Sequence, residues 1–412
     1  MRRTSLVAAA AAASAITLGA TALTTTATAA PSVAGAPGGY IVVLDDSADA
    51  RTVAAAHADR FDLDLGHVYS SALQGYATTM TPATAAAVEA LPGVAWVQKD
   101  TPVATTAQST PTGINRVDAD ASPTAKIDGV DQRVNVDVAV IDTGVDLDHP
   151  DLNVYRAGAK NCSIGLGADD DHGHGSHVAG TIGALDNTTG VVGVAPGARI
   201  WPVKVLTAVG TGFNSDVICG IDYVAANSDK IEVANMSLGG SGSDDGNCGQ
   251  SNGDAMHTSI CNAVAKGVTF VAAAGNDAED AKNFTPAAYD EVITVSALAD
   301  FNGLPGGGAP KTCRTDQDDT FASFSNFGAD VDLIAPGVCI HSTSMAGGYA
   351  TLSGTSMAAP HVAGGAALYK ALNPSATPAQ VRSNLIGTGT LDWSNADDPD
   401  GIKERLLNVK TY

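Results

Sequence analysis

The chain has 412 residues, of which 44% are hydrophobic and 16% are charged, and its formal net charge at pH 7 is −22. This is the composition of a globular protein, and the length allows two or three domains with a large core. The acidity argues against nucleic acid as a partner, because a phosphate backbone needs a surface rich in Lys and Arg. It is compatible both with a solvated acidic surface and with calcium, which carboxylates bind.

The first 29 residues predict an export signal. Arg2 and Arg3 are positively charged, the Ala-rich stretch 6–23 is uncharged, and Ala27-Thr28-Ala29 offers small residues to a signal peptidase. The alternative is a single-pass anchor, for which the stretch is weakly hydrophobic. No later stretch predicts a membrane span, so we expect a secreted, extracellular protein that leaves the membrane once residues 1–29 are removed.

The next part of the chain predicts a small α+β unit. The apolar run 40–44 predicts a strand, the Ala-rich run 48–61 a helix, and residues 69–80 one or two strands. Thr81-Pro82 is typical of a helix start, and this helix should run to about residue 91, before a last strand over 94–97. The β-α-β-β-α-β order indicates a ferredoxin-like fold.

A polar stretch rich in Thr, Ala and Pro over residues 101–112 predicts a linker to a larger domain. In that domain apolar runs alternate with helix-like segments. The apolar runs span residues 134–141, 200–206, 233–238, 268–274, 292–297 and 331–335, and the last predicted helix spans residues 378–386. Short apolar strands separated by helices imply a doubly wound α/β domain with a mainly parallel sheet covered on both faces.

Polar residues stand at the ends of three of these runs. Asp142 ends the first run, Ser237 ends the third, and Asn276 follows the fourth. Doubly wound sheets place their sites at the carboxyl ends of strands. One such residue alone would more often be a turn residue, but the three together predict an active site.

Two further segments predict a nucleophile and its base. Ser356 stands among small residues where a helical run begins, so unpaired N–H groups would favour an oxyanion beside it; a plain N-cap serine is the alternative. A serine hydroxyl needs a base, and His174 opens another helix-like segment. His172 and His177 lie close by, which also suggests a metal site, but there is no HExxH, and His177 is expected to be structural. Asp142 would orient His174, with Asp146 and Asp148 as alternatives that do not end the strand.

Three strings resemble the subtilisin family of serine peptidases. In chain order they are Val140-Ile141-Asp142-Thr143-Gly144, His174-Gly175-Ser176-His177-Val178-Ala179-Gly180 and Gly354-Thr355-Ser356-Met357-Ala358-Ala359-Pro360-His361-Val362-Ala363-Gly364. The resemblance covers nearly everything after the export signal. It implies that Ser356 attacks the scissile carbonyl, His174 takes and returns the proton, and Asp142 orients His174. It also implies that the Asn276 amide and the Ser356 backbone N–H stabilise the oxyanion.

The resemblance further implies a cleft for an extended peptide. Ser237-Leu238-Gly239 and Gly210-Thr211-Gly212 correspond to the family's two binding segments, and glycine there lets a peptide backbone approach. Broad specificity for protein and peptide substrates follows. Asp277, Phe284 and Ala287 would line or rim the primary pocket, in a layout similar to proteinase K, with an apolar or aromatic preference.

The same resemblance divides the chain into an export signal (1–29), an inhibitor propeptide (30–106) and a catalytic domain (107–412). The junction predicts self-cleavage between Thr106 and Ala107, with a cut several residues earlier as the alternative. The propeptide would block the cleft and assist the folding of a parallel sheet. We expect the mature enzyme to be a monomer without a catalytic cofactor.

A calcium site is implied by the stretch 185–191, which matches the family's tight calcium loop in spacing. The implied ligands, several through backbone carbonyls, are Gln108, Asp151, Leu185, Asn187, Thr189 and Val191. An ordinary polar turn is the alternative, and Gln108 is a ligand only if the mature chain begins at Ala107.

Six cysteines, all after residue 106, predict disulfides in an exported protein. Fifteen connectivities are possible. Short loops favour Cys248–Cys261 and Cys313–Cys339, which leaves Cys162–Cys219. Segment 301–319 departs from the subtilisin pattern and is expected to be a second ion site or a loop pinned by a disulfide.

Two other classes of protein fit these motifs less well. A non-catalytic binding module on the same fold would lack a member of the triad, and none is missing. A lipase or esterase of the α/β-hydrolase type places its serine in GxSxG and its histidine last. Here the serine stands in Gly354-Thr355-Ser356-Met357-Ala358, and the histidine precedes it.

Overall fold

The computed structural model describes residues 38–100, 107–165 and 167–412, and the chain forms two compact units. The export signal predicted over residues 1–29 and the predicted cleavage residue Thr106 lie outside the described residues. Within the described ranges, the structure contains no helix with the length and apolar character of a membrane span.

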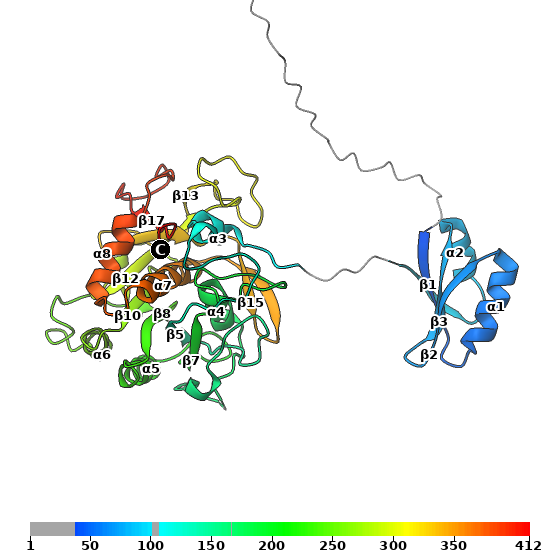
Figure 1. The fold of residues 1–412 in the computed structure, drawn as a ribbon, viewed down its shortest axis with the longest axis horizontal. Helices are drawn as coiled ribbons and strands as arrows, with labels where there is room; N and C mark the ends of the chain where they lie inside the picture. Colours follow the sequence, from blue (N-terminus) through cyan, green and yellow to red (C-terminus); the bar gives the residue numbers. More distant parts are fainter. Residues whose placement is uncertain (1–37, 101–106, 166) are drawn as a thin grey trace, which may run out of the picture. The chain divides into compact units, whose positions relative to one another are not determined.

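The smaller unit, blue in Figure 1, is a four-stranded antiparallel sheet with two helices. Its elements are β1 (Gly38–Leu44), α1 (Ala50–Phe61), β2 (Asp64–Ser70), β3 (Gln74–Met80), α2 (Pro82–Glu89) and β4 (Val94–Lys99). Thr81 caps α2, because its hydroxyl accepts a hydrogen bond from the backbone of Thr84 at 3.1 Å. The strand order β2-β3-β1-β4 confirms the predicted ferredoxin-like fold.

The larger unit is built on one long sheet. Its path runs β17-β14-β12-β10-β8-β5-β7-β6, all parallel, and β13 pairs antiparallel with β12. These strands are β5 (Asp137–Asp142), β6 (Lys160–Asn161), β7 (Arg199–Lys204), β8 (Ile231–Met236), β10 (Thr269–Ala273), β12 (Val292–Ala299), β13 (Thr320–Phe321), β14 (Leu333–Pro336) and β17 (Arg405–Leu406). The mainly parallel sheet agrees with the prediction, and each predicted run overlaps one of its strands.

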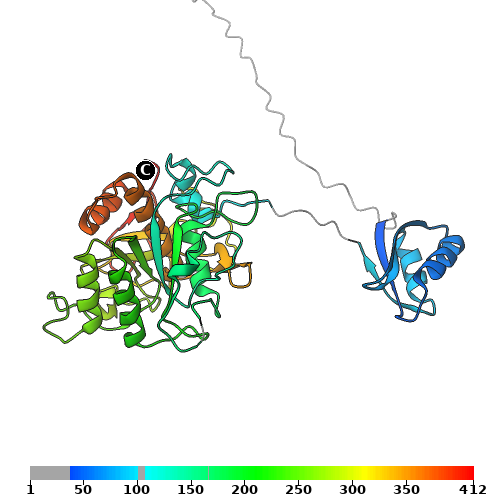
Figure 2. The same ribbon diagram turned by 60° about the horizontal axis from the view of Figure 1, so that its bottom comes forward.

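Helices cover both faces of this sheet, as Figure 2 shows. The helices are α3 (Thr112–Arg116), α4 (His174–Gly183), α5 (Asn214–Ala226), α6 (Ala255–Val264), α7 (Thr355–Leu372) and α8 (Pro378–Thr388). Successive residues of β5 alternate between two cores: Val138 and Val140 pack with α4 and α7, whereas Ala139 and Ile141 pack with α5 and α6. This alternation explains why the central strand is a continuous apolar run.

Shorter elements complete the larger unit. They are the two-stranded pairs β9 (Gly240–Ser241) with β11 (Phe284–Thr285) and β15 (Ile340–Ser344) with β16 (Gly348–Leu352), and the 3-10 turns 119–121, 156–158 and 281–283. The disulfides are Cys162–Cys219, Cys248–Cys261 and Cys313–Cys339, the pairing that short loops favoured. Segment 301–319 is therefore a loop pinned by a disulfide. The carboxylate of Asp318 also holds it, accepting the backbone N–H groups of Phe301 and Ala309.

Candidate active site

The end of β5 and the start of α4 bring a carboxylate and an imidazole together. Nδ1 of His174 lies 2.7 Å from Oδ1 of Asp142. The side chain of Asp142 is fully buried, and its Oδ1 also accepts the backbone N–H of Thr143 at 2.7 Å. Because a carboxylate only accepts, the proton of a neutral imidazole lies on Nδ1, and Nε2 is left as the basic nitrogen.

The surroundings of His174 tune its basicity. Burial alone would lower the pKa of His174, but the charge of Asp142, the hydrogen bond to it and the charge of Asp170 outweigh burial and raise the pKa above its ordinary value. The imidazole is therefore a stronger base than a free histidine, while its side chain remains 20% exposed and accessible.

Asp170 organises the turn that leads into α4. Its Oδ1 accepts hydrogen bonds from the hydroxyl of Thr143 and from the backbone N–H groups of His172 and Gly173. Its Oδ2 accepts from the backbone N–H and from the hydroxyl of Ser176, at 2.9 and 2.6 Å. One buried carboxylate thus ties the end of β5 to the first turn of the helix that carries His174.

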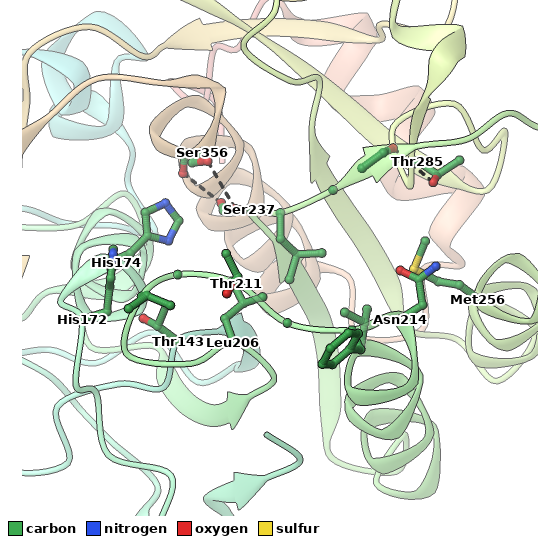
Figure 3. A pocket seen from close by; sticks show the side chains of 18 residues that line it. Thr143, His172, His174, Leu206, Thr211, Asn214, Ser237, Met256, Thr285 and Ser356 are labelled. Carbon is green, nitrogen blue, oxygen red and sulfur yellow. Dashed lines mark hydrogen bonds between the residues drawn. The ribbon is translucent and has the colours of Figure 1, made fainter. Parts of the chain in front are cut away.

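Ser356 is the second residue of α7, where backbone N–H groups lack partners within the helix. Its hydroxyl donates to the carbonyl of Ser237 at 3.2 Å, and the hydroxyl of Ser237 donates to the carbonyl of Ser356 at 2.8 Å (Figure 3). A length of 3.2 Å is long for an O–H···O bond, so the Ser356 hydroxyl is weakly held. His174 and Ser356 line the same cavity.

The side-chain amide of Asn276 lies near the backbone N–H of Ser356 at the start of α7. The Oδ1 atom of Asn276 accepts the backbone N–H and the hydroxyl of Thr355, at 2.8 and 3.1 Å, which fixes the side-chain amide. A Cβ atom placed on Gly354 would lie 3.6 Å from Oδ1 and 3.7 Å from Nδ2 of Asn276, and 3.7 Å from the backbone nitrogen of Ser356. Both nitrogens therefore lie close to Gly354, just before α7.

The cavity that His174 and Ser356 line has a volume of about 550 Å³. It contains both predicted binding segments, Gly210-Thr211-Gly212 and Ser237-Leu238-Gly239. Asn276, Asp277, Phe284 and Ala287 are not among its lining residues in the described part of the chain. The ring of Phe284 lies against Gly239, where an added Cβ atom would come within 2.4 Å of it, while Ala287 is buried and Asp277 is exposed.

Comparisons with known proteins agree with this geometry. Residues 134–403 match the subtilase family, and residues 39–106 match the peptidase inhibitor I9 family. The chain belongs to the subtilase family. It is 38% identical over 332 residues to an alkaline protease of Alkalihalobacillus alcalophilus, which covers 81% of this chain and 78% of that protein. It is 40% identical over 302 residues to subtilisin E of Bacillus subtilis (strain 168), covering 73% of this chain and 71% of that protein.

A solved structure supports the same assignment. The crystal structure of a cold adapted subtilisin-like serine proteinase matches with a TM-score of 0.54 at 36% identity, and covers 69% of this chain and 97% of that one. The protein is therefore a subtilisin-like serine peptidase whose substrates are peptides. Its smaller unit is a peptidase inhibitor domain, and hence a partner of the catalytic domain.

The six residues implied as calcium ligands lie together in this subtilase. The Gln108 amide bonds the carbonyls of Leu185 and Val191, at 2.6 and 3.1 Å, while Asp151 accepts from the Asn187 amide and the Val191 backbone. Thr189 donates to Oδ1 of Asn187. A Cβ atom on Gly190 would come within 2.3 Å of Oδ2 of Asp151, so glycine keeps this space open. The carboxylate of Asp151, the amide oxygen of Asn187 and the two carbonyls that accept from Nε2 of Gln108 are oxygen ligands of the kind that calcium binds.

Sequence reasoning missed several residues of the cavity. Thr143, Leu206, Val217, Met256 and Thr285 also line it. Thr143 and Leu206 follow the ends of β5 and β7, so the strand-end rule was the available signal for them. Nothing in the local sequence around Met256 or Thr285 indicates a binding wall. His177 is structural as predicted: it is buried, and its Nε2 lies 2.9 Å from the carbonyl oxygen of Ile340.

Proposed function

We propose that the protein hydrolyses peptide bonds in proteins through a triad of Asp142, His174 and Ser356. The observation that carries this proposal is the 2.7 Å contact between buried Asp142 and Nδ1 of His174, which leaves Nε2 as a base in the cavity that Ser356 also lines. This arrangement matches what a serine nucleophile requires, a base oriented by a third group.

The reaction follows from these positions. The Ser356 hydroxyl leaves its long bond to the Ser237 carbonyl, gives its proton to Nε2 of His174 and attacks the scissile carbonyl carbon. His174 then gives that proton to the leaving amine, and an acyl group stays on Ser356. Water then gives a proton to Nε2 of His174 and attacks the acyl carbon, and His174 passes that proton to the Ser356 oxygen as the bond to the acid product breaks. Asp142 stabilises the imidazolium in both half-reactions.

The oxyanion of each tetrahedral intermediate would be bound by Nδ2 of Asn276 and the backbone N–H of Ser356. Thr355 supports this role, because its two hydrogen bonds to Oδ1 fix the orientation of the Asn276 amide and leave Nδ2 as the group that can donate. A donor fixed in this way costs no reorganisation when the negative charge develops.

Broad specificity is the expected consequence of the cavity. Glycines at 210, 212 and 239 expose backbone in both walls, so a substrate would be held mainly by main-chain hydrogen bonds. Leu238, Val217 and Met256 add apolar surface, which favours an apolar or aromatic side chain in the primary pocket.

The precursor would be exported and would process itself. We infer that residues 1–29 are removed on secretion and that the domain over residues 30–106 inhibits the enzyme until cleavage between Thr106 and Ala107. The match of residues 39–106 to a peptidase inhibitor family supports this order of events.

Calcium would bind at the loop 185–191 with Gln108 and Asp151 and would stabilise the mature enzyme. When bound, the ion supplies charge that offsets Asp151, whose pKa burial otherwise raises. Removing calcium from the purified enzyme should lower its Tm, and Gly190→Ala, which fills the space beside Asp151, should abolish that dependence. An unchanged Tm after chelation would contradict this site.

A covalent label tests the catalytic assignment. A fluorophosphonate probe should modify Ser356 in the purified mature enzyme, as located by peptide mass spectrometry. The precursor carrying Ser356→Ala should take no label and should stay uncut at Thr106. Ser375→Ala changes an exposed serine and is the matched control, which should mature and label normally. Labelling or normal maturation of isolated Ser356→Ala would refute the proposal.

A further inference from the structure

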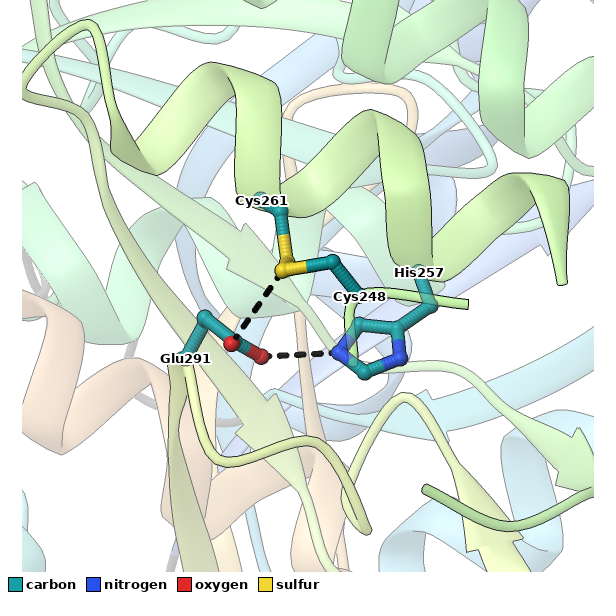
Figure 4. A group of neighbouring side chains, drawn as sticks. All are labelled: Cys248, His257, Cys261 and Glu291. Carbon is teal, nitrogen blue, oxygen red and sulfur yellow. Dashed lines mark hydrogen bonds and ion pairs between the residues drawn. A yellow bond between two sulfur atoms is a disulfide. The ribbon is translucent and has the colours of Figure 1, made fainter. Parts of the chain in front are cut away.

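A second group of chemically active side chains lies at the start of α6, apart from the triad. His257 on α6 is fully buried, and Nε2 of its ring lies 2.8 Å from a carboxylate oxygen of Glu291. Figure 4 shows the other ring nitrogen turned away from Glu291. On that side, Nδ1 lies 3.6 Å from Oδ1 of Asp244 and 3.6 Å from Oδ1 of Asp245.

The two sides of this ring are not equivalent. The 2.8 Å contact is a normal hydrogen bond, so Nε2 carries a proton and donates it to Glu291. A separation of 3.6 Å is too long for a hydrogen bond, and within the described residues Nδ1 has no hydrogen-bond partner. The Nδ1 lone pair of a neutral ring would thus face two carboxylates, which is unfavourable unless Nδ1 takes a second proton or a metal cation lies between them.

The spacing fits such a cation. The candidate ligand atoms of His257, Asp244 and Asp245 all lie within 4.8 Å of one another. A metal ion that binds nitrogen and oxygen at about 2.0–2.2 Å in tetrahedral geometry separates its ligands by about 3.4 Å. A histidine that binds a metal through one nitrogen usually donates the other N–H to a carboxylate, as His257 does to Glu291.

The ligands are held in place by the fold itself. Asp245 accepts four backbone N–H groups of the loop 247–252, and Asp244 accepts those of Gly246 and Asp290. The ring of His257 stacks on Tyr289 with 4.0 Å between centroids and 3° between planes. The Cys248–Cys261 disulfide ties the same loop to α6. Asp244 also lines a surface cavity, which gives an ion a way in.

We propose that His257 Nδ1, Asp244 and Asp245 bind a divalent transition-metal ion of the zinc class, with Glu291 orienting the histidine. One nitrogen and two carboxylate ligands suit Zn²⁺ better than calcium, which prefers oxygen alone. The ion offsets the charge of three carboxylates around one imidazole. It also braces a wall of the substrate cavity, because Gly240 and Met256 of the same segment line that cavity.

Zinc binding by the mature enzyme tests the site. Ser356 is first blocked with phenylmethylsulfonyl fluoride, calcium is kept present, and transition metals are removed with 1,10-phenanthroline. The protein is then titrated with zinc chloride by calorimetry, and bound metal is counted by mass spectrometry after desalting. The wild type should bind one zinc ion per chain and gain Tm. Cobalt should bind without sulfur-to-metal charge-transfer bands, because both cysteines stay in the disulfide.

Three variants decide the outcome. Asp244→Asn keeps the shape of the side chain and should weaken zinc binding at least tenfold, and His257→Gln should abolish it. His341→Gln removes an exposed histidine on β15 and should bind zinc like the wild type. If His257→Gln fails to fold, Asp244→Asn still tests the site. Absence of zinc binding by the wild type, or unchanged affinity in Asp244→Asn, would overturn the proposal, including the case in which zinc occupies the calcium loop instead.

Discussion

Replacing Asp170 by Asn separates its electrostatic effect on His174 from its structural role. If the Asn oxygen keeps the three hydrogen bonds made by Oδ1, the new NH2 group takes the place of Oδ2. It then faces the backbone N–H of Ser176, so that two donors point at each other. The Ser176 hydroxyl can turn to accept, but the N–H cannot. One orphaned buried donor costs roughly 1–3 kcal/mol, which corresponds to a fall in Tm of roughly 2–10 °C.

The same substitution removes one of the charges that raise the pKa of His174. His174 must be neutral to act as a base, so a lower pKa moves the acid limb of the activity profile to lower pH. We expect this shift in kcat/KM for a chromogenic peptide measured from pH 5 to 9. Asp171→Asn is the matched control: Asp171 is 51% exposed and pairs with Lys204. An acid limb that stays in place or moves upward in Asp170→Asn would refute the electrostatic argument.

Other perturbations follow from single contacts. Asp142→Asn should lower kcat about 10³–10⁴-fold at neutral pH and move the acid limb of the pH profile to lower pH, because the carboxylate that orients His174 and raises its pKa is lost. A loss of kcat under tenfold would contradict the triad. Burial raises the pKa of Glu404 from 4.5 to about 8, so its ionisation costs up to roughly 5 kcal/mol as pH rises through that window. Glu404→Gln should therefore match the wild-type Tm at pH 4 and exceed it at pH 9, and equal values at pH 9 would disprove this. Replacing Cys162 and Cys219 by Ser removes a disulfide between residues 57 positions apart and should lower the free energy of unfolding by about 4 kcal/mol. The Tm should fall, while kcat/KM at 25 °C should stay unchanged.

The sequence predicted best where one physical rule acts locally. Asp142 ends one buried strand of the parallel sheet, and Ser237 and Asn276 follow two others, so the strand-end rule alone was enough to place them at one edge. The pattern of apolar runs placed six strands of this sheet to within a few residues, but it did not predict the two-residue strands β6, β13 and β17. The preference of cysteines for partners that close short loops was enough to indicate the disulfides.

Long-range side-chain contacts were beyond the reach of such rules. The reciprocal bonds between Ser237 and Ser356 join positions 119 apart, and neither segment specifies the other. Asp170 stands in a run of three aspartates, and only the folded turn shows which of them accepts five hydrogen bonds. The acidic loop before α6 looks like a solvated turn in sequence, because Asp244 and Asp245 meet His257 only after the loop folds back on the helix.

Gly175 shows why a small residue beside the base carries information about catalysis. A Cβ atom at this position would lie 2.0 Å from the carbonyl oxygen of Gly144 and 3.2 Å from Cβ of Asp142. Any side chain there would force the start of α4 away from the end of β5, and the 2.7 Å contact between His174 and Asp142 would be lost with it. The glycine after the histidine is thus a packing requirement of the proposed catalytic pair, set by how closely the helix must approach the strand.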